Sequence, residues 1–204
     1  MLSAKVIVEL QDELTRRWHQ AGGPEPEVAG PEIADAWLNA IEVQHRANFD
    51  LWHIEDEART PGTADDKIAD VKRRIDRTNQ RRNDLTEELD RALLSWLGTR
   101  GLPRSDAPLN SESPGLMIDR LSILALKIYH TREEMERKNA PDRHAELNRG
   151  RLGVLEDQRH DLAHCLDELW AGTLAGTRRF KLYRQLKMYN DPELNPAIYG
   201  KKQG

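Results

Sequence analysis

Apolar residues recur along most of this chain with the three- and four-residue spacing of an α-helix, and no segment alternates convincingly like a β-strand. Proline and glycine interrupt the pattern near 30–31, 60–62, 98–114 and 140–142, where helices are expected to end or begin. We therefore predict five main helices, over about 3–20, 32–60, 65–97, 115–139 and 142–171. A short C-terminal tail follows, which we expect to be helical, with an irregular path as the alternative.

The connections at 60–64 and near 140 are so short that the helices they join must run antiparallel. The sequence thus predicts an all-α fold, an antiparallel helical bundle with its core in about 32–171 and its tail in 177–204. A length of 204 residues suits one hydrophobic core and no linker-like tract divides the chain, so we expect 1–204 to form a single domain. The first helix would pack against the side of the bundle, with an apolar stripe of Val6, Leu10, Leu14 and Trp18.

The segment 115–130 is apolar on almost every side, which is typical of a buried central helix. Polar residues nevertheless interrupt the apolar faces of the later helices at particular places. On or beside those faces lie His45, Asn48, His53, Glu55, Asp56 and Arg59 in the second helix, Asp76, Asn79, Arg82 and Asn83 in the third, Arg120, Lys127 and His130 in the fourth, and Arg151 and Gln158 in the fifth.

Folding the chain about its connections predicts which of these positions meet. Asn48 would lie level with Asp76, and His45 level with Asn79. Across the later connections, the expected neighbours, each uncertain by about one turn, are Thr86 with Lys127, Asn83 with His130, and Arg120 with Asp161. The polar positions should therefore gather at mid-bundle.

Two interpretations of such a cluster compete. The first is a buried network of salt bridges and hydrogen bonds that fixes the packing register, although about ten polar side chains are harder to satisfy than leucines. The second is a ligand pocket in the bundle core, a common place for such sites. A di-metal carboxylate site is a third alternative, because Glu42 and His45 have the Glu-x-x-His spacing of such bundles, but Glu42 points away from the core stripe.

The pocket interpretation assigns roles by side-chain chemistry. Glu55, Asp56 and Asp76 would hold a divalent cation such as Mg²⁺. His45 and His53 are the candidate general acids or bases, because histidine titrates near neutrality, and Asp56 and Asp76 are further catalytic candidates. The mixture of cations, carboxylates and amides favours a phosphorylated or sugar-like ligand. Its candidate binding residues are Asn48, Trp52, Arg59, Asn79, Arg82, Asn83, Arg120, Lys127 and His130.

Composition and charge limit the classes of partner that we expect this protein to bind. The net charge of -4 argues against wholesale nucleic-acid binding. No apolar run reaches membrane-spanning length and the N-terminus lacks the pattern of a secretory signal, so we expect a cytoplasmic protein. If helical, 178–189 would have an apolar and aromatic side and a basic side, which could rest on an anionic membrane surface or a partner. The alternative is a closing helix packed on the bundle.

Motifs in a fixed order extend over most of the chain from about residue 40 to 199. They are HRANFDLWHIEDEAR (45–59), VKRRIDRTNQRRNDL (71–85), SPGLMIDRLSILALKIYH (113–130), QRHDLAHCLDEL (158–169) and FKLYRQLKMYNDPELNPAIY (180–199). Together they resemble the bacterial domain of unknown function 4254 family, although Leu186 stands where that family has an aromatic residue. The resemblance implies no particular reaction. Genes of the family tend to lie among glycosyltransferase and surface-polysaccharide genes, which implies a role in cell-surface glycan metabolism.

The hypothesis we favour is that the mid-bundle cluster binds, with or without transforming it, a phosphorylated or nucleotide-linked sugar of cell-surface glycan metabolism. The alternative is a non-enzymatic scaffold or accessory subunit for glycosyltransferases, in which the buried polar residues are structural. A pocket should gain stability from its ligand by mass action, whereas a satisfied network should not respond.

Overall fold

The computed structural model describes residues 3–20, 36–62, 64–141 and 143–184, and these residues form five α-helices. The helices are α1 (Ala4–Gln20), α2 (Ala36–Ala58), α3 (Asp65–Gly98), α4 (Pro114–Glu136) and α5 (His144–Leu174). The all-α prediction is confirmed, and the predicted helix ends agree to within a few residues wherever the structure describes them. No described helix combines the length and the apolar character needed to cross a membrane.

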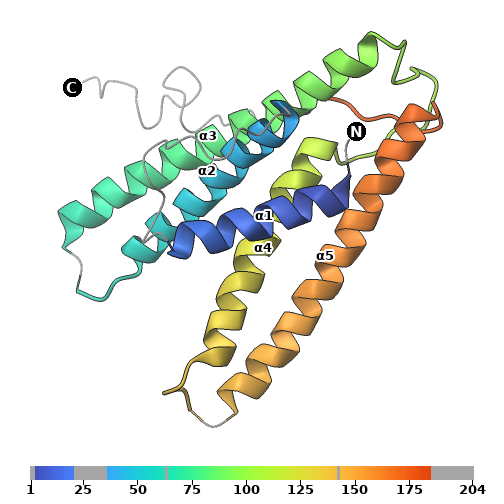
Figure 1. The fold of residues 1–204 in the computed structure, drawn as a ribbon. Coiled ribbons are helices and arrows are strands. Elements are labelled where there is room, and N and C mark those ends of the chain that lie inside the picture. The colour runs from blue at the N-terminus through green and yellow to red at the C-terminus, as the bar shows by residue number, and fades with distance from the viewer. Residues whose placement is uncertain (1–2, 21–35, 63, 142, 185–204) are drawn as a thin grey trace, which may run out of the picture.

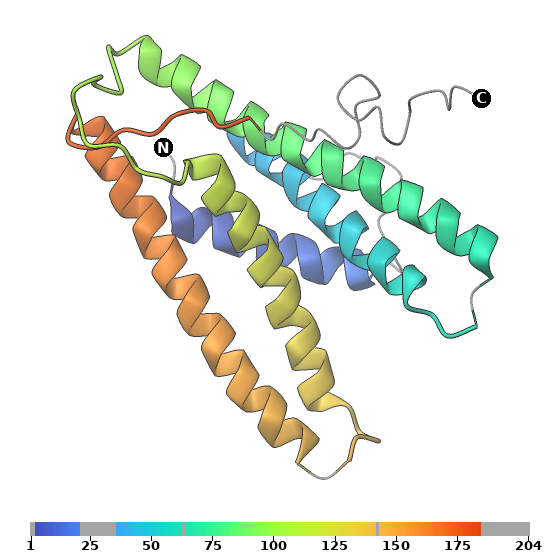
Figure 2. The same cartoon turned by 180° about the vertical axis from the view of Figure 1, so that it is seen from behind.

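The helices form two antiparallel hairpins, and α1 lies across both of them (Figure 1). α2 packs along α3 in one hairpin and α4 packs along α5 in the other. The hairpins approach each other near the ends of α3 and α5 and diverge toward their tips, which the view from behind also shows (Figure 2). α4 contacts each of the other four described helices, as expected of the buried central helix.

Apolar side chains from every described helix meet in one buried cluster. It includes Ile7 of α1, Ile41 of α2, Leu89 of α3, Leu121 of α4 and Leu166 of α5. Each of these is at most 1% exposed. Because burying an aliphatic side chain of this size contributes about 1.5–3 kcal/mol, this cluster is the main force that holds α1 and the two hairpins together.

The buried face of α1 differs from the predicted stripe. Val6 is 43% exposed, whereas the polar residues Gln11 and Thr15 are almost completely buried beside Leu14 and Trp18. A polar residue is tolerated on a buried face when its hydrogen bonds are satisfied within the protein. The side chains that meet Gln11 and Thr15 belong to the site described below.

Contacts with α5 fix α1 in its crossing position. The backbone nitrogen of Ala4 donates a hydrogen bond to Asp167 at 2.8 Å, which places a carboxylate at the positive end of the helix dipole. Nη1 of Arg159 lies 2.8 Å from both carboxylate oxygens of Asp12. The contact between α1 and α5 thus contains charge-assisted hydrogen bonds at the start of α1 and near its middle.

The start of α4 is fastened to the side of α3, not to its end. Ser113 Oγ and the backbone nitrogen of Gly115, the latter at 2.7 Å, both donate to the buried carboxylate of Asp90. A Cβ added at Gly115 would lie 2.6 Å from the carbonyl oxygen of Thr86, so glycine allows the two helices to come this close. Burial raises the pKa of Asp90 to about 6.

This attachment explains why the predicted register of α3 against α4 is wrong. The connection 99–113 folds back beside the last turns of α3, so Thr86 lies next to Gly115, not next to Lys127. Arg82 consequently forms an ion pair with Asp119, at 3.3 Å. The predicted pairing of Asn83 with His130 depends on the same incorrectly predicted course of residues 99–113.

The predicted register of α2 against α3 is also displaced. Asn48 and Arg82 both contact Asp119, so Arg82, and not Asp76, lies level with Asn48. Residues 64–70 at the start of α3 are all exposed, and the first buried residue of this helix is Val71. The pairing of the two helices therefore begins later along α3 than the short connection predicts.

The described part of the C-terminal tail is not helical. Residues 178–184 run extended, and Arg179 forms an isolated bridge with Leu109. Phe180, 2% exposed, packs in a cluster with Leu93, Leu97 and Trp170. The expected helix is therefore wrong for 178–184, and the amphipathic surface that it would have presented to a membrane does not form there. Residues 185–189 of the predicted helix lie outside the described residues.

Candidate functional site

Polar side chains from α1, α2, α3 and α4 meet in the core between these helices. We call this group the buried network, and it consists of Gln11, Thr15, Gln44, His45, Asn48, Arg82, Asp119 and Ser122. All are buried except Arg82, whose side chain is 25% exposed. Three of the candidate residues, His45, Asn48 and Arg82, belong to it.

The hydrogen bonds around His45 determine its protonation. Thr15 Oγ1 donates to the carbonyl oxygen of Gln11 at 2.8 Å, so it accepts from His45 Nε2 at 2.9 Å. Ser122 Oγ accepts from Asn48 Nδ2 at 2.9 Å and donates to His45 Nδ1 at 2.7 Å. A neutral imidazole therefore satisfies both ring nitrogens of His45. Burial lowers the pKa of His45 to about 3, which agrees with this assignment.

Asp119 is the second centre of the buried network. Its Oδ1 accepts from Gln44 Nε2 at 2.6 Å and from Asn48 Nδ2 at 2.9 Å, and Arg82 Nε lies 3.3 Å away. Burial raises the pKa of Asp119, and the charge of Arg82 and the two amide donors oppose this rise. The side-chain oxygens of Gln11 and Gln44 are buried without a hydrogen-bond partner among the described residues.

No residue of the buried network lines either of the cavities described below. His45 cannot accept a proton from a ligand there, because both of its ring nitrogens are engaged and its pKa is far below neutrality. For His45, Asn48 and Arg82 the contacts therefore fit the structural interpretation better than the pocket interpretation.

The carboxylates proposed as magnesium ligands do not come together. Glu55 and Asp56 both face Arg59, at 2.9 and 3.6 Å, and Asp76 pairs with Lys72 at 2.7 Å. Each carboxylate is therefore turned toward a cation about one turn away on its own helix. Among the described residues, Glu55, Asp56 and Asp76 are not part of a group close enough to share an ion. The structure thus does not assemble the predicted Mg²⁺ site from these three carboxylates.

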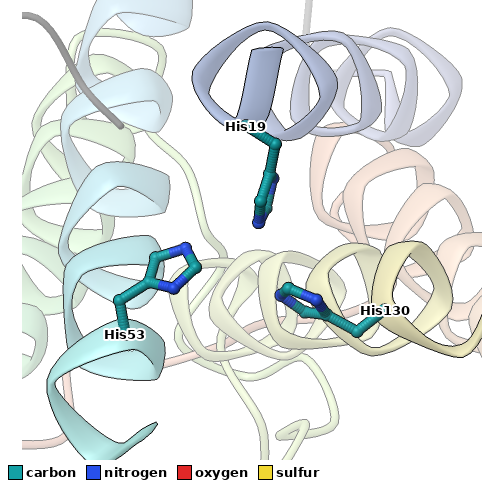
Figure 3. Close-up of side chains that lie close together, drawn as sticks. All are labelled: His19, His53 and His130. Carbon is teal, nitrogen blue, oxygen red and sulfur yellow. The ribbon is translucent and has the colours of Figure 1, made fainter. Parts of the chain in front are cut away.

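Histidines from three helices point toward one another beside Trp52 (Figure 3). We call His19, His53 and His130 the histidine cluster; one nitrogen of each lies within 4.8 Å of the others. His19 is in the last turn of α1, His53 in α2 and His130 in α4. They meet because α1 crosses both hairpins, which brings its C-terminal end against α2 and α4 (Figure 1).

The hydrogen bonds of the cluster leave two ring nitrogens bare. His19 Nδ1 lies 2.7 Å from the carbonyl oxygen of Thr15, which can only accept, so Nδ1 carries the proton. His130 Nδ1 lies 2.9 Å from the carboxylate of Glu133 and donates to it in the same way. The Nε2 atoms of His19 and His130 are buried and have no hydrogen-bond partner among the described residues. A buried, unpaired acceptor of this kind requires an explanation.

Aromatic rings hold these imidazoles in place. Tyr129 stacks on His19 with a centroid distance of 4.1 Å, and Trp52 stacks on His130 at 4.8 Å. Phe49 meets the edges of His19 and His53. The orientation of the cluster is therefore set by packing on several sides.

Electrostatics favours the neutral imidazole at His19 and at His53. Burial lowers the pKa of His19, with only partial opposition from its bond to the Thr15 carbonyl. Burial also lowers the pKa of His53, and the neighbouring His19 and His130 add to this effect because like charges repel. His19 and His53 thus carry a free lone pair near neutral pH.

A cavity of about 640 Å³ adjoins the cluster between α2, α4 and α5. Trp52 and His130 line it together with Lys127, Arg151 and Gln158. Lys127 is exposed and has no ion-pair partner among the described residues. The cavity therefore combines an aromatic face, two cations, the amides of Asn148 and Gln158 and the carboxylate of Glu134. Cations and amides are groups that bind phosphates and hydroxyls.

A second cavity, of about 590 Å³, continues along the junction of α4 and α5 and shares Lys127 and Gln158 with the first. Arg120 and Asp161 both line it, as the predicted register of these helices requires. Arg120 is paired with Glu112 at 2.8 Å. The remaining ligand candidates lie in neither cavity: Arg59 is exposed, Asn79 half-buried and Asn83 buried.

The sequence analysis missed His19, although the chain contains a signal for it. Gln11, Thr15 and His19 follow one another at four-residue spacing, which places them on one face of α1. That face is the buried one, whereas the predicted stripe included the exposed Val6. Because α1 was predicted to pack against the side of the bundle, these polar residues were not selected as candidates for the site.

Comparison with known families agrees with the resemblance in the motifs. The family model described as "Protein of unknown function (DUF4254)" matches residues 38–182, which is more than half of the chain. The chain belongs to this family. No curated protein and no solved structure matches the chain.

The match to the DUF4254 family covers α2, α3, α4 and α5. His53, His130 and the cavity residue Lys127 therefore lie inside the matched region, whereas His19 lies before it. The candidate site thus joins the DUF4254 region to the preceding helix α1.

Proposed function

We propose that this protein binds a phosphorylated or nucleotide-linked sugar of cell-surface glycan metabolism in the cavity beside the histidine cluster. The observation that supports this best is Lys127, which lines both cavities and has no ion-pair partner in the part of the chain that the structure describes. A cation that no carboxylate neutralises is available to a phosphate group. The volume of about 640 Å³ is typical of small-molecule sites.

Other side chains in the cavity fit the remaining parts of such a ligand. The face of Trp52 suits a sugar ring or a base, and the amides of Asn148 and Gln158 suit hydroxyl groups. Arg151 supplies a second cation, and its Nη1 donates to Asn148 at 3.3 Å. Transformation of the ligand is a further step, for which His130 and Glu134 are the imidazole and the carboxylate that line the cavity.

The test is a binding assay by calorimetry and thermal shift with a nucleoside diphosphate sugar, a sugar 1-phosphate and inorganic pyrophosphate, with the free sugar as a negative control. Lys127→Gln should weaken binding of the phosphorylated ligands about 10- to 100-fold, because a hydrogen bond to a charged group contributes about 1.5–3 kcal/mol. Lys67→Gln is the matched control, since Lys67 is exposed at the start of α3 away from the cavity. Trp52→Leu should weaken binding of the sugar ligands more than that of pyrophosphate.

A scaffold or accessory subunit for glycosyltransferases is the second candidate. Leu147 and Val154 are 60% and 56% exposed on α5, and Val154 lies in the wall of the cavity. Exposed apolar side chains of this size can dock a partner protein. If no phosphorylated ligand changes the melting temperature, and Lys127→Gln behaves like Lys67→Gln, the ligand proposal fails and the scaffold is preferred.

A further inference from the structure

We propose that His19, His53 and His130 together bind a divalent transition-metal ion of the Zn²⁺ type. The proposal stands on the geometry of the histidine cluster and does not depend on the function proposed above. The ring nitrogens come from three different helices and lie within 4.8 Å of one another.

The nitrogen positions are compatible with one shared ion. Ligand nitrogens lie about 2.0–2.1 Å from zinc, so in a tetrahedral site they are about 3.3 Å apart. The observed nitrogens, which lie within 4.8 Å of one another, would have to draw closer to share one ion. Figure 3 shows the rings already directed at a common centre.

The unused nitrogens are those a metal requires. A histidine ligand commonly donates its other ring N–H to a carbonyl or carboxylate, which fixes the tautomer and orients the ring. His19 donates from Nδ1 to the carbonyl of Thr15 and His130 donates from Nδ1 to Glu133, at 2.7 and 2.9 Å. In both, Nε2 is left buried, with no hydrogen-bond partner among residues 3–20, 36–62, 64–141 and 143–184. An ion would convert these two unsatisfied acceptors into ligands.

Ligand chemistry selects the class of ion. All three donors are imidazoles, which suit Zn²⁺, Co²⁺, Ni²⁺ and Cu²⁺, whereas Mg²⁺ and Ca²⁺ prefer oxygen donors. A three-histidine set leaves one position of a tetrahedral ion for water or a ligand atom. His130 also lines the larger cavity, so the ion would lie beside that space.

The alternative is a group of histidines that pack as rings and bind no metal. The stacking of Tyr129 on His19 and of Trp52 on His130 is compatible with both explanations. The two differ in what happens when metal is added. Ring packing predicts no stoichiometric binding, whereas a metal site predicts one ion per chain and a higher melting temperature by mass action.

The experiment uses the full chain without a polyhistidine tag, stripped of metal by a chelator. Zn²⁺ is titrated in competition with a chromogenic chelator, Co²⁺ is followed by its visible absorption, and Mg²⁺ serves as the oxygen-preferring control. We expect one equivalent of Zn²⁺, an intense tetrahedral Co²⁺ spectrum that Zn²⁺ abolishes, and no response to Mg²⁺. His19→Gln, His53→Gln and His130→Gln should each weaken Zn²⁺ binding more than about 100-fold, beyond the usual effect of losing a supporting group.

The chain offers a matched control in His160 and His164, which are exposed on α5 at a spacing that could bind metal by itself. The double variant His160→Gln/His164→Gln should keep the wild-type stoichiometry and affinity. Circular dichroism checks that each variant folds. If a variant does not fold, the Co²⁺ spectrum of the wild type decides whether the metal site exists. Absence of stoichiometric Zn²⁺ binding, equal binding by the cluster variants, or loss of binding in the α5 variant would overturn the proposal.

Discussion

His45 and His19 are close neighbours in space with opposite hydrogen-bond environments. His45 stacks on Trp18 at 5.3 Å, and both of its ring nitrogens have partners. His19 follows Trp18 in the chain, yet its Nε2 is buried and has no hydrogen-bond partner within the described part of the chain. The comparison teaches that burial of a polar side chain does not by itself indicate function. What distinguishes the histidine cluster from the buried network is that its unpaired nitrogens converge, next to a cavity.

Removal of the central carboxylate of the buried network should have the largest effect. Asp119→Ala should lower the free energy of unfolding by about 4 kcal/mol, because it leaves buried amides without an acceptor and Arg82 without its counter-charge. Urea denaturation at neutral pH measures this change. Asp157→Ala, at an exposed position on α5, is the control and should change stability by less than about 0.5 kcal/mol. Equal effects of the two substitutions would show that the network does not hold the fold.

A matched pair of histidine substitutions tests the comparison directly. His45→Phe should lower the free energy of unfolding by about 2–3 kcal/mol, because Ser122 loses its acceptor and Thr15 loses its donor. His19→Phe in metal-free protein should change it by about 1 kcal/mol, because only the hydrogen bond from Nδ1 to the Thr15 carbonyl is lost and a ring can still stack on Tyr129. His19→Phe should nevertheless abolish the response to Zn²⁺. The reverse order of stability losses would contradict the assignment of His45 as structural.

The pH dependence of the His45→Phe effect follows from the pKa near 3. The unfolded chain binds a proton at His45 below about pH 6.5, but the folded chain does not, so this group destabilises the wild type as the pH falls from 6.5. Between pH 6.5 and pH 5 the loss is about 2 kcal/mol. His45→Phe should therefore be strongly destabilising at pH 7.5 and nearly neutral at pH 5.

Comparing the variant with the wild type at each pH is necessary because other groups titrate in the same range. Asp90, with a pKa near 6, contributes in the opposite direction, since the folded chain holds its proton more tightly than the unfolded chain. Its contribution is common to both proteins and cancels in the difference. A stability difference that stays constant between pH 7.5 and pH 5 would mean that folded His45 is readily protonated.

The sequence predicted the features that depend on local pattern. Helical periodicity and the positions of proline and glycine are properties of neighbouring residues, so the all-α fold and the helix ends follow from them. The same pattern selected His53, His130, Trp52 and Lys127, because each interrupts or borders an apolar face.

The rest depends on long-range contacts that no local pattern reveals. The register of α4 is set by Ser113 and Gly115 meeting Asp90, which lies more than twenty residues earlier in the chain. The course of α1 across both hairpins, which brings His19 to the cluster, is likewise tertiary. His45 and His53 both belong to α2. Their neighbours from α1 and α4 decide that both ring nitrogens of His45 are hydrogen-bonded, whereas His53 meets two other histidines.

The smallest expected effect concerns Glu133, which supports His130 without belonging to the cluster. Glu133→Gln should weaken Zn²⁺ binding about tenfold, the lower end for a group that orients a histidine ligand, because the Glu133 side chain is 52% exposed. The stability of metal-free protein should be almost unchanged, since an exposed pair contributes little. Competition titration and urea denaturation measure the two quantities separately. Glu134→Gln is the neighbouring control: Glu134 accepts from His144, so its loss should leave Zn²⁺ affinity intact. If Glu133→Gln changed stability but not affinity, His130 would not be oriented by this carboxylate for metal binding, and its bare Nε2 would need another explanation.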